Sequence, residues 1–233
     1  MIARLIRYSL VFVLLSASAV LTGCSSFVQK PIDLDAQFWN DKDPVIGVAL
    51  SPLPAPQLAL TGNQGLLELA INKGVNSKLS DQVSAWELHD LESLPDEVVA
   101  SLKAKGLNAK RIPDAIDLTK FKETEKREGY LARNISDLKS KYGVDRVLLI
   151  SYTTTGAFRS YYSVVPTSVP TPQVGGIGML VDPKDSRLVW YKPFVVVQPA
   201  QGEWDQPGYS NLSNAFYQAL DGSRQQILSA FNK

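Results

Sequence analysis

The chain has 233 residues, with 24 basic and 23 acidic side chains and one cysteine. This near balance of charge gives no sign of the basic surface that nucleic-acid-binding proteins need. A single cysteine excludes an internal disulfide and a cluster of thiolate metal ligands. The chain is long enough for one large domain, or two small ones, whose stability must come from an apolar core.

The first 24 residues follow the order of an export signal. Arg4 and Arg7 form a basic head, residues 8–20 form an apolar run, and small residues lead to the cysteine. The motif Leu21-Thr22-Gly23-Cys24 resembles the lipobox of bacterial lipoprotein precursors. That resemblance implies cleavage just before Cys24, a diacylglyceryl group on its sulfur and an acyl chain such as palmitate on its amino group.

Two other interpretations of this segment stay open. A single transmembrane helix needs about 20 apolar residues to cross a ~30 Å hydrocarbon core, and the run over 8–20 is shorter. An ordinary secretory signal, cleaved among the small residues 16–19, would leave the lone thiol exposed in an oxidising compartment. Both points favour the lipoprotein interpretation.

The residues after the cysteine indicate a destination. Ser25 and Ser26 follow Cys24, with no acidic residue of the kind that retains enteric lipoproteins in the inner membrane. By the same resemblance we expect anchoring in the outer membrane, facing the periplasm, with the inner membrane and the cell surface as alternatives. Several acyl chains give stable anchoring with no transmembrane helix. Loss of the two signal arginines leaves 22 basic residues against 23 acidic ones, a net charge of −1.

The predicted organisation is a signal peptide over 1–23, a tether over 24–43 and a single periplasmic domain over 44–233. The tether is unperiodic and ends near the pair Phe38-Trp39, which we expect to plug the core of the domain rather than to bind a ligand. A short apolar run over 45–50, bounded by prolines, predicts a buried strand. Residues 51–60 contain three prolines and predict a loop.

A long helix is predicted next. Thr61-Gly62-Asn63-Gln64 fits a capping box. Apolar residues then recur at every fourth position, which predicts a long helix, broken near Gly74. These residues are Leu67, Ile71, Val75, Leu79 and Val83.

Further helices and strands alternate over the middle of the chain. Ser93 to Asp96 predicts the start of a second helix that ends at Gly106, and residues 107–112 predict a strand. After a charged stretch over 114–128, apolar residues over 131–142 predict a third helix with Gly143 as its C-cap. Residues 144–152 follow at once and predict the central strand.

In the second half, residues 153–162 can continue the central strand, and residues 174–181 and 187–198 predict further strands, antiparallel and joined by a hairpin turn at 182–186. A final helix is predicted over 212–231. The expected fold class is α/β (α+β): a mixed sheet of about five strands, with helices mainly on one face and an antiparallel meander in the second half.

Two segments carry a remote resemblance to known periplasmic domains. The run Gly143 to Ser151, and the run Gly178 to Asp182 with Val189-Trp190, resemble the amino-terminal domain of the Tol propeller protein and lipoproteins akin to the curli secretion channel. The insertion over 61–106 departs from their pattern. The resemblance implies a scaffold for envelope assembly or partner binding and no reaction.

The residues themselves offer little for catalysis. His89 is the only histidine, and its charged neighbours indicate a surface position. The glycines near 175–178 lack the spacing of a dinucleotide loop. Acid pairs, Glu203 with Asp205 and Asp182 with Asp185, lie in turn-like segments where carboxylates bind backbone amides. We therefore expect no catalytic residue, cofactor or metal. A cell-wall hydrolase and a small-ligand carrier remain the alternative functions.

Two segments are candidate surfaces for an envelope protein or peptidoglycan partner, with no role for nucleic acid. The proline-rich stretch over 161–174 predicts an extended arm. The stretch over 203–209 offers stiff aromatic side chains of the kind enriched in binding hot spots. Packing of either loop on the protein's own core is the competing interpretation. The candidate contact residues are Tyr161, Tyr162, Val165, Val169, Trp204 and Tyr209.

Overall fold

The computed structural model describes residues 28–232, and the predicted lipobox with Cys24 lies outside this range. The strands are β1 (Ile46–Leu50), β2 (Gln57–Asn63), β3 (Ala109–Arg111), β4 (Arg146–Tyr162), β5 (Val165–Pro166), β6 (Thr171–Asp182) and β7 (Arg187–Val197). They form one sheet in the order β3-β1-β4-β6-β7, with β2 and β5 also paired to β4. β1 pairs with β3 and with β4, and β2 pairs with β4, all in parallel. β4, β6 and β7 form an antiparallel meander. The predicted fold class is confirmed.

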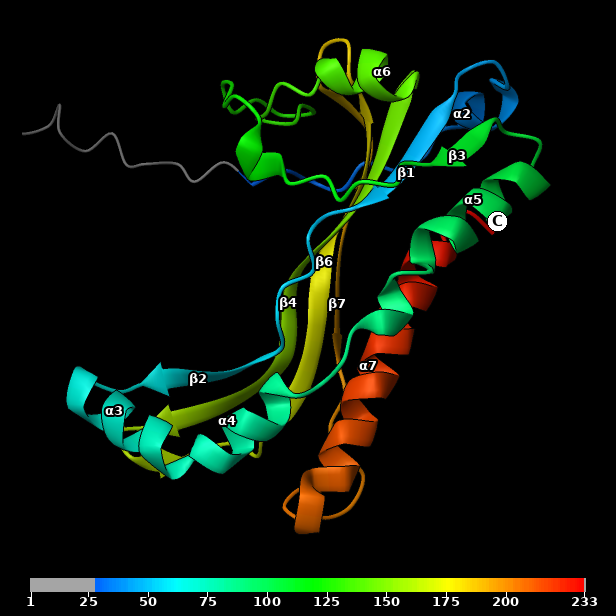
Figure 1. Cartoon of the computed structure of the whole chain (residues 1–233). Coiled ribbons are helices and arrows are strands. Elements are labelled where there is room, and N and C mark those ends of the chain that lie inside the picture. The colour runs from blue at the N-terminus through cyan, green and yellow to red at the C-terminus, as the bar shows by residue number, and fades with distance from the viewer. Residues whose placement is uncertain (1–27, 233) are drawn as a thin grey trace, which may run out of the picture.

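The helices of the described part are α2 (Ala36–Asn40), α3 (Leu66–Val75), α4 (Ser77–Ser84), α5 (Leu94–Ala104), α6 (Asp137–Tyr142) and α7 (Ser210–Leu228). α7 packs along β6 and β7, and α5 lies beside it over β1 and β3 (Figure 1). Between residues 28 and 232, no helix is long and apolar enough to cross a membrane.

The molecule is elongated because β4 runs through all of it (Figure 1). Its 17 residues correspond to about 55 Å at ~3.3 Å per residue. The first half of β4 pairs with β1, and the second half pairs with β2 on the same side. We call the part around β1, β3 and the first half of β4 the base. The part formed by β2, α3, α4 and the far ends of β4 and β6 is the arm.

The base has a core on both faces of the sheet. On one face Leu148, Ile150 and Trp190 are buried against α5 and α7. On the other face Leu149 and Met179 are buried with the loop and helix around α6. This second layer does not continue beyond the base, because every second residue at the end of β7 is exposed. These are Val195 and Val197, with exposed fractions of 55% and 45%.

A glycine allows β2 to lie against β4. Gly156 has φ +126°, and a Cβ placed there would lie 2.1 Å from the carbonyl oxygen of Gln57. A side chain at this position would therefore meet both backbone strain and a steric clash. The pairing of β2 with β4, from which the arm is built, therefore requires a glycine at position 156.

The segment before β1 is more ordered than a free tether. Ile32 exchanges backbone hydrogen bonds of 2.8 and 2.9 Å with Tyr191 of β7. Phe38, on α2, is 2% exposed and belongs to the core, as its expected role as a plug requires. From residue 28 onward, the stretch interpreted as a tether is therefore packed on the base.

The prediction for residues 57–64 was wrong. Residues 57–63 form a strand instead of a loop, and Thr61 lies in that strand instead of capping a helix. The N-cap of α3 is Gly65, with no side-chain hydrogen bond. Gln64 does bond Thr61, but through its side-chain amide to the carbonyl oxygen at 3.0 Å. The alternation of Leu58 and Leu60 was hidden by the three preceding prolines.

Two predicted helices differ in extent. The long helix after residue 61 is broken at Asn76 into α3 and α4, close to the predicted break. The helix expected from residue 131 is regular only over α6, although Ile135 is still buried beneath it. Gly143 has φ +59° and ends α6 in the left-handed conformation, as predicted.

Candidate functional site

The end of the arm carries most of the candidate contact residues. β4 turns into β5 there, and the turn leaves Tyr162 66% exposed and Val165 59% exposed. Val169, in the loop before β6, is 52% exposed. Tyr161 points the other way: it is 4% exposed, and its hydroxyl accepts a hydrogen bond of 2.7 Å from the Asn76 amide. Three of these four side chains are thus displayed, and the fourth holds the turn on the helices.

α3 is an amphipathic helix whose apolar stripe faces solvent. Leu67, Ile71 and Val75 are 72%, 46% and 76% exposed, and Leu66 beside them is 89% exposed. The one buried residue of the helix is polar: Asn72 is 1% exposed. Its side-chain amide donates to the carbonyl oxygen of Ser163 at 2.9 Å and to the Gln64 side chain at 2.8 Å. Hydrogen bonds, rather than its apolar face, hold α3 on the arm.

The break at Asn76 explains this reversal. Asn76 is 3% exposed, donates to the Asn72 carbonyl at 2.6 Å, and accepts from the Arg159 guanidinium at 2.8 Å. After the break, Leu79 and Val83 of α4 turn inward and are 3% and 0% exposed. Of the five apolar residues in the repeat, only the last two are therefore buried.

The second candidate segment folds back on the protein. Trp204 and Tyr209 stack with ring centroids 6.2 Å apart, and the Arg159 guanidinium lies 5.0 Å from the Trp204 ring centroid. Both aromatic residues are partly buried against the main core. Their role as contact residues remains a prediction, and only their outer surfaces are open to a partner.

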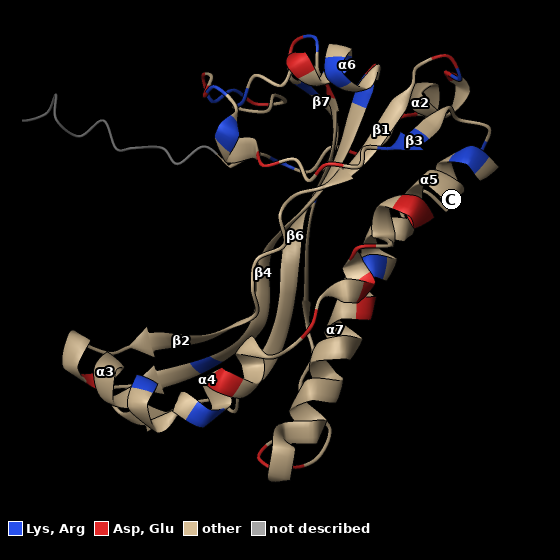
Figure 2. Ribbon diagram, in the orientation of Figure 1, with Lys and Arg blue, Asp and Glu red and all other residues tan. Residues whose placement is uncertain are grey.

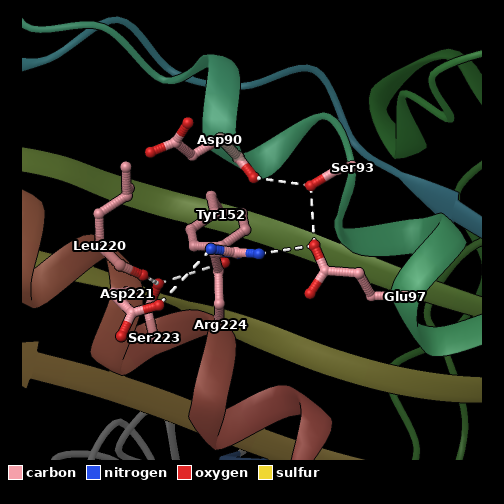
Figure 3. Close-up of polar contacts among 8 residues, drawn as sticks. All are labelled: Asp90, Ser93, Glu97, Tyr152, Leu220, Asp221, Ser223 and Arg224. Atoms are coloured by element: carbon pink, nitrogen blue, oxygen red, sulfur yellow. Dashed lines mark hydrogen bonds and ion pairs between the residues drawn. The ribbon is translucent and has the colours of Figure 1, made fainter. Parts of the chain in front are cut away.

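A polar network lies at the base between α5 and α7 (Figure 3). The Arg224 guanidinium donates to a Glu97 carboxylate oxygen at 2.6 Å, and the Ser93 hydroxyl donates to the same oxygen at 2.8 Å. Ser223 donates to the Leu220 carbonyl oxygen at 2.6 Å, so the Tyr152 hydroxyl donates to Ser223 across 3.2 Å. These contacts join two helices to the central strand.

The electrostatics of this network indicate a structural role. Burial raises the pKa of Tyr152 to about 12, so its phenol stays neutral at ordinary pH. Burial alone would raise the pKa of Glu97, but the hydrogen bonds from Ser93 and Arg224 outweigh it and lower the pKa below its usual value. The Glu97, Tyr152 and Ser223 side chains each bond a neighbour in the protein, whereas the Nε atom of Arg224 is buried without a hydrogen-bond partner.

Of the residues considered for catalysis, His89 lies exposed at the surface, and Asp182 and Asp185 stabilise a turn. His89 is 74% exposed along its side chain and faces Glu92 at 3.5 Å. Asp182 and Asp185 accept backbone hydrogen bonds within their turn, at 2.9 and 3.0 Å. Over residues 28–232, no group of three His, Cys, Asp or Glu side chains is placed to hold a metal ion.

Two open hollows lie on the arm. One, of about 430 Å³, is lined by Ala59, Thr153, Gly156 and Phe158 among others. The other, of about 460 Å³, lies between β2 and the helices α3 and α4, against Leu58 and the partly covered Leu60. Their linings are apolar or neutral for the most part, and hold none of the acid pairs considered above.

Comparison with known proteins leaves the family open. No family model and no curated protein matches this sequence. Among solved structures, protein XCC0632 from Xanthomonas campestris is similar with a TM-score of 0.39 and 13% identity, over 86% of this chain and 90% of that one. The PelC dodecamer from Paraburkholderia phytofirmans gives 0.33 and 14%, over 82% and 88%. Lipoprotein GNA1162 from Neisseria meningitidis gives 0.27 and 16%, over 80% and 99%. Likeness at this level carries no conclusion about function.

The sequence did not reveal the exposed stripe of α3. Apolar residues at every fourth position predict a buried helix face, and this spacing continues without change from α3 into α4. The available signal was the pair Asn72 and Asn76, spaced by one helical turn beside that repeat. Two amides on one side of a short helix indicate a face that is hydrogen-bonded inward.

Proposed function

We propose that this chain is a lipoprotein anchored in the outer membrane through Cys24, and that it acts as a non-catalytic binding or scaffolding component of the cell envelope. The observation that carries the binding role is the gathering of exposed apolar side chains at the end of the arm. Eight of them lie on α3 and on the hairpin around β5: Leu66, Leu67, Ile71, Val75, Tyr162, Val164, Val165 and Val169.

Such exposure is unusual for large apolar residues of one region. Single exposed apolar side chains are ordinary, whereas groups of them mark surfaces that meet a partner. Few charged side chains lie among these apolar residues, since Glu68 and Lys73 are the only charged residues of α3. The lack of charge supports contact with an apolar protein surface, with peptidoglycan as the less favoured partner.

The position of the arm suits display away from an anchor at Cys24. The chain is fixed on the base at Gln29, whose side chain accepts from the Gly129 amide at 2.8 Å, and at Ile32. From Cys24 to residue 28 the chain reaches at most about 14 Å. Across the sheet, Ile32 lies level with Leu149 of β4. From Leu149 to the hairpin, β4 continues for about 40 Å. The lipid on the tether therefore cannot cover the end of the arm.

One experiment tests the anchor and a second tests the surface. Cys24→Ala should release the protein from membranes, and retention with unchanged mobility would contradict lipidation. For the surface, a photoreactive residue at 67 or 165 should cross-link one defined envelope protein in intact cells. The same residue at exposed position 197, on β7, is the matched control.

The cross-link at 67 should weaken when Ile71 and Val75 are changed to serine, because the apolar stripe is then interrupted. Equal labelling from all three positions would refute a dedicated surface. The alternative, a cell-wall hydrolase, predicts instead an activity that falls when Glu203 or Asp182 is neutralised.

A further inference from the structure

One arginine of the arm contacts three segments that lie far apart in the sequence. Arg159 is the only charged residue in the second half of β4, which is blue beside α4 in Figure 2. Its guanidinium donates a hydrogen bond of 2.8 Å to the side-chain oxygen of Asn76, the residue that separates α3 from α4. Its Cζ atom lies 5.6 Å from the ring centroid of Tyr161 and 5.0 Å from that of Trp204. The hairpin, the break between the helices and the loop over 203–209 therefore meet at this side chain.

The charge of Arg159 is not neutralised by an acidic side chain. Within residues 28–232, no carboxylate lies in ion-pair contact with it. Its Nε atom is buried without a hydrogen-bond partner. Because removing a cation from water without a counter-ion is unfavourable, the guanidinium needs other compensation. The Asn76 oxygen and the faces of the Tyr161 and Trp204 rings supply it, so the position of the guanidinium depends on all three.

Trp204 is itself held by the start of α7. Its ring stacks on that of Tyr209, with 6.2 Å between the centroids and 16° between the planes. Tyr209 is the N-cap of α7 and has a left-handed φ of +52°. Both rings are partly buried against the main core. The contact with Arg159 therefore connects the start of α7 to the arm.

Asn76 passes this constraint on to α3. Its side-chain oxygen accepts from Arg159, and its nitrogen donates to the Asn72 carbonyl oxygen at 2.6 Å and to the Tyr161 hydroxyl at 2.7 Å. A side-chain amide has one accepting end and one donating end. Turning it over would set its nitrogen against the guanidinium and its oxygen against the Asn72 carbonyl, so both contacts would become repulsive. Arg159 thus helps to fix the last turn of α3, where the exposed stripe ends at Val75.

We propose that Arg159 is a positioning residue, which joins the loop over 203–209 to the break at Asn76, so that Trp204 holds α3 in the orientation that presents its stripe. The two candidate surfaces then form one composite surface instead of two separate patches. The binding role of this surface rests on the function proposed above. The coupling between Trp204 and α3 is a property of the chain alone.

Amide hydrogen exchange of the full-length protein in detergent tests the coupling. Trp204→Ala should speed exchange over α3 by about two- to thirtyfold, the factor that corresponds to the usual strength of a cation–π contact. Exchange over β1, in the base, should stay as in the parent, which separates this effect from a general loss of stability. Trp204→Phe keeps a ring face for the guanidinium and should keep most of the protection of α3.

The matched control removes the same kind of contact from the base. The Cζ atom of Arg127 lies 3.5 Å from the ring centroid of Tyr130, and neither residue belongs to the arm. Tyr130→Ala should therefore leave exchange over α3 unchanged. An equal effect of Tyr130→Ala and Trp204→Ala on α3 would refute a specific link.

A double-variant cycle tests whether the link passes through Arg159. Arg159→Ala alone should speed exchange over α3 and over residues 203–209. Adding Trp204→Ala to Arg159→Ala should then change exchange over α3 little, because the ring has already lost the cation that it holds. Effects of the two changes that simply multiply would overturn the proposal, and so would exchange over α3 that Trp204→Ala leaves unchanged.

The photo-cross-link at position 67 gives a second measurement in cells. It should weaken in Trp204→Ala and keep its parent intensity in Tyr130→Ala, because only the first change releases α3. A cross-link that Trp204→Ala leaves unchanged would refute the composite surface. Absence of any cross-link in the parent would contradict the proposed binding function, whereas hydrogen exchange would still decide the coupling.

Discussion

Leu67 and Leu79 belong to one run in which an apolar residue recurs at every fourth position. Replacing each by alanine should nevertheless change stability very differently, with a large loss at Leu79 and almost none at Leu67. Leu79 is 3% exposed, and removing a buried leucine side chain costs about 2–5 kcal/mol through lost burial and the cavity left behind. For a domain of this size, each kcal/mol lowers Tm by about 2–4 °C, so Leu79→Ala should lower it by about 4–20 °C. Leu67 is 72% exposed, and Leu67→Ala should change stability by less than about 0.5 kcal/mol.

Urea unfolding followed by circular dichroism measures both variants. The midpoint should shift for Leu79→Ala with an unchanged slope, because a change in slope would mean that the compactness of a state had changed. Val75→Ala and Val83→Ala repeat the comparison at 76% and 0% exposure. If Leu67→Ala destabilised the protein as much as Leu79→Ala, the repeat would have one buried face throughout, and the exposed stripe of α3 would be refuted.

Three further changes test the interior. Because burial raises the pKa of Tyr152 to about 12 from an unfolded value near 10, the neutral phenol stabilises the fold fully below pH ~10, and up to about 2.7 kcal/mol is lost as pH rises through 12. Tyr152→Phe should flatten this alkaline limb in unfolding titrations, and an unchanged limb would contradict it. Gly156→Ala should cost about 1–3 kcal/mol by urea unfolding and loosen β2, seen as faster amide exchange, because a Cβ there meets the Gln57 carbonyl; protection equal to the parent would contradict the close approach. The pKa of Glu97 is lowered, so the stability that its carboxylate contributes is present above the ordinary pKa of 4.5 and is lost as pH falls through the folded value. Glu97→Gln should cost about 1 kcal/mol of stability at pH 7 and weaken the loss of stability in acid. If the variant lost stability in acid as the parent does, the ion pair between Glu97 and Arg224 would be excluded.

The main elements of the sheet followed from local patterns. The run 45–50 and the strands of the second half are apolar, β-branched and bounded by turn residues, and these signals need no knowledge of distant contacts. Gly143 as a left-handed C-cap belongs to the same class. Predictions of this kind succeeded because each segment decides its own conformation.

The arm was harder to predict because tertiary contacts decide it. Residues 57–63 form a strand only because Gly156, about a hundred positions later, leaves room for it. α3 turns its apolar side outward because Asn72 is bonded to Ser163, a partner that periodicity cannot reveal. Three of the candidate contact residues on the hairpin, Tyr162, Val165 and Val169, are exposed, whereas the exposed stripe of α3 beside them was not predicted. A role of either in contact with a partner stays a prediction.

The unbroken course of β4 and β6 through base and arm has a mechanical consequence. An appendage on a flexible linker reorients freely, whereas one built on strands shared with the main sheet moves only if backbone hydrogen bonds give way. A load applied at the hairpin is carried as shear along the ladder between these two strands, toward the residues that α7 covers. The register of this ladder shifts only between Tyr152 and Thr154, so the base sets the direction of the arm through two shared strands.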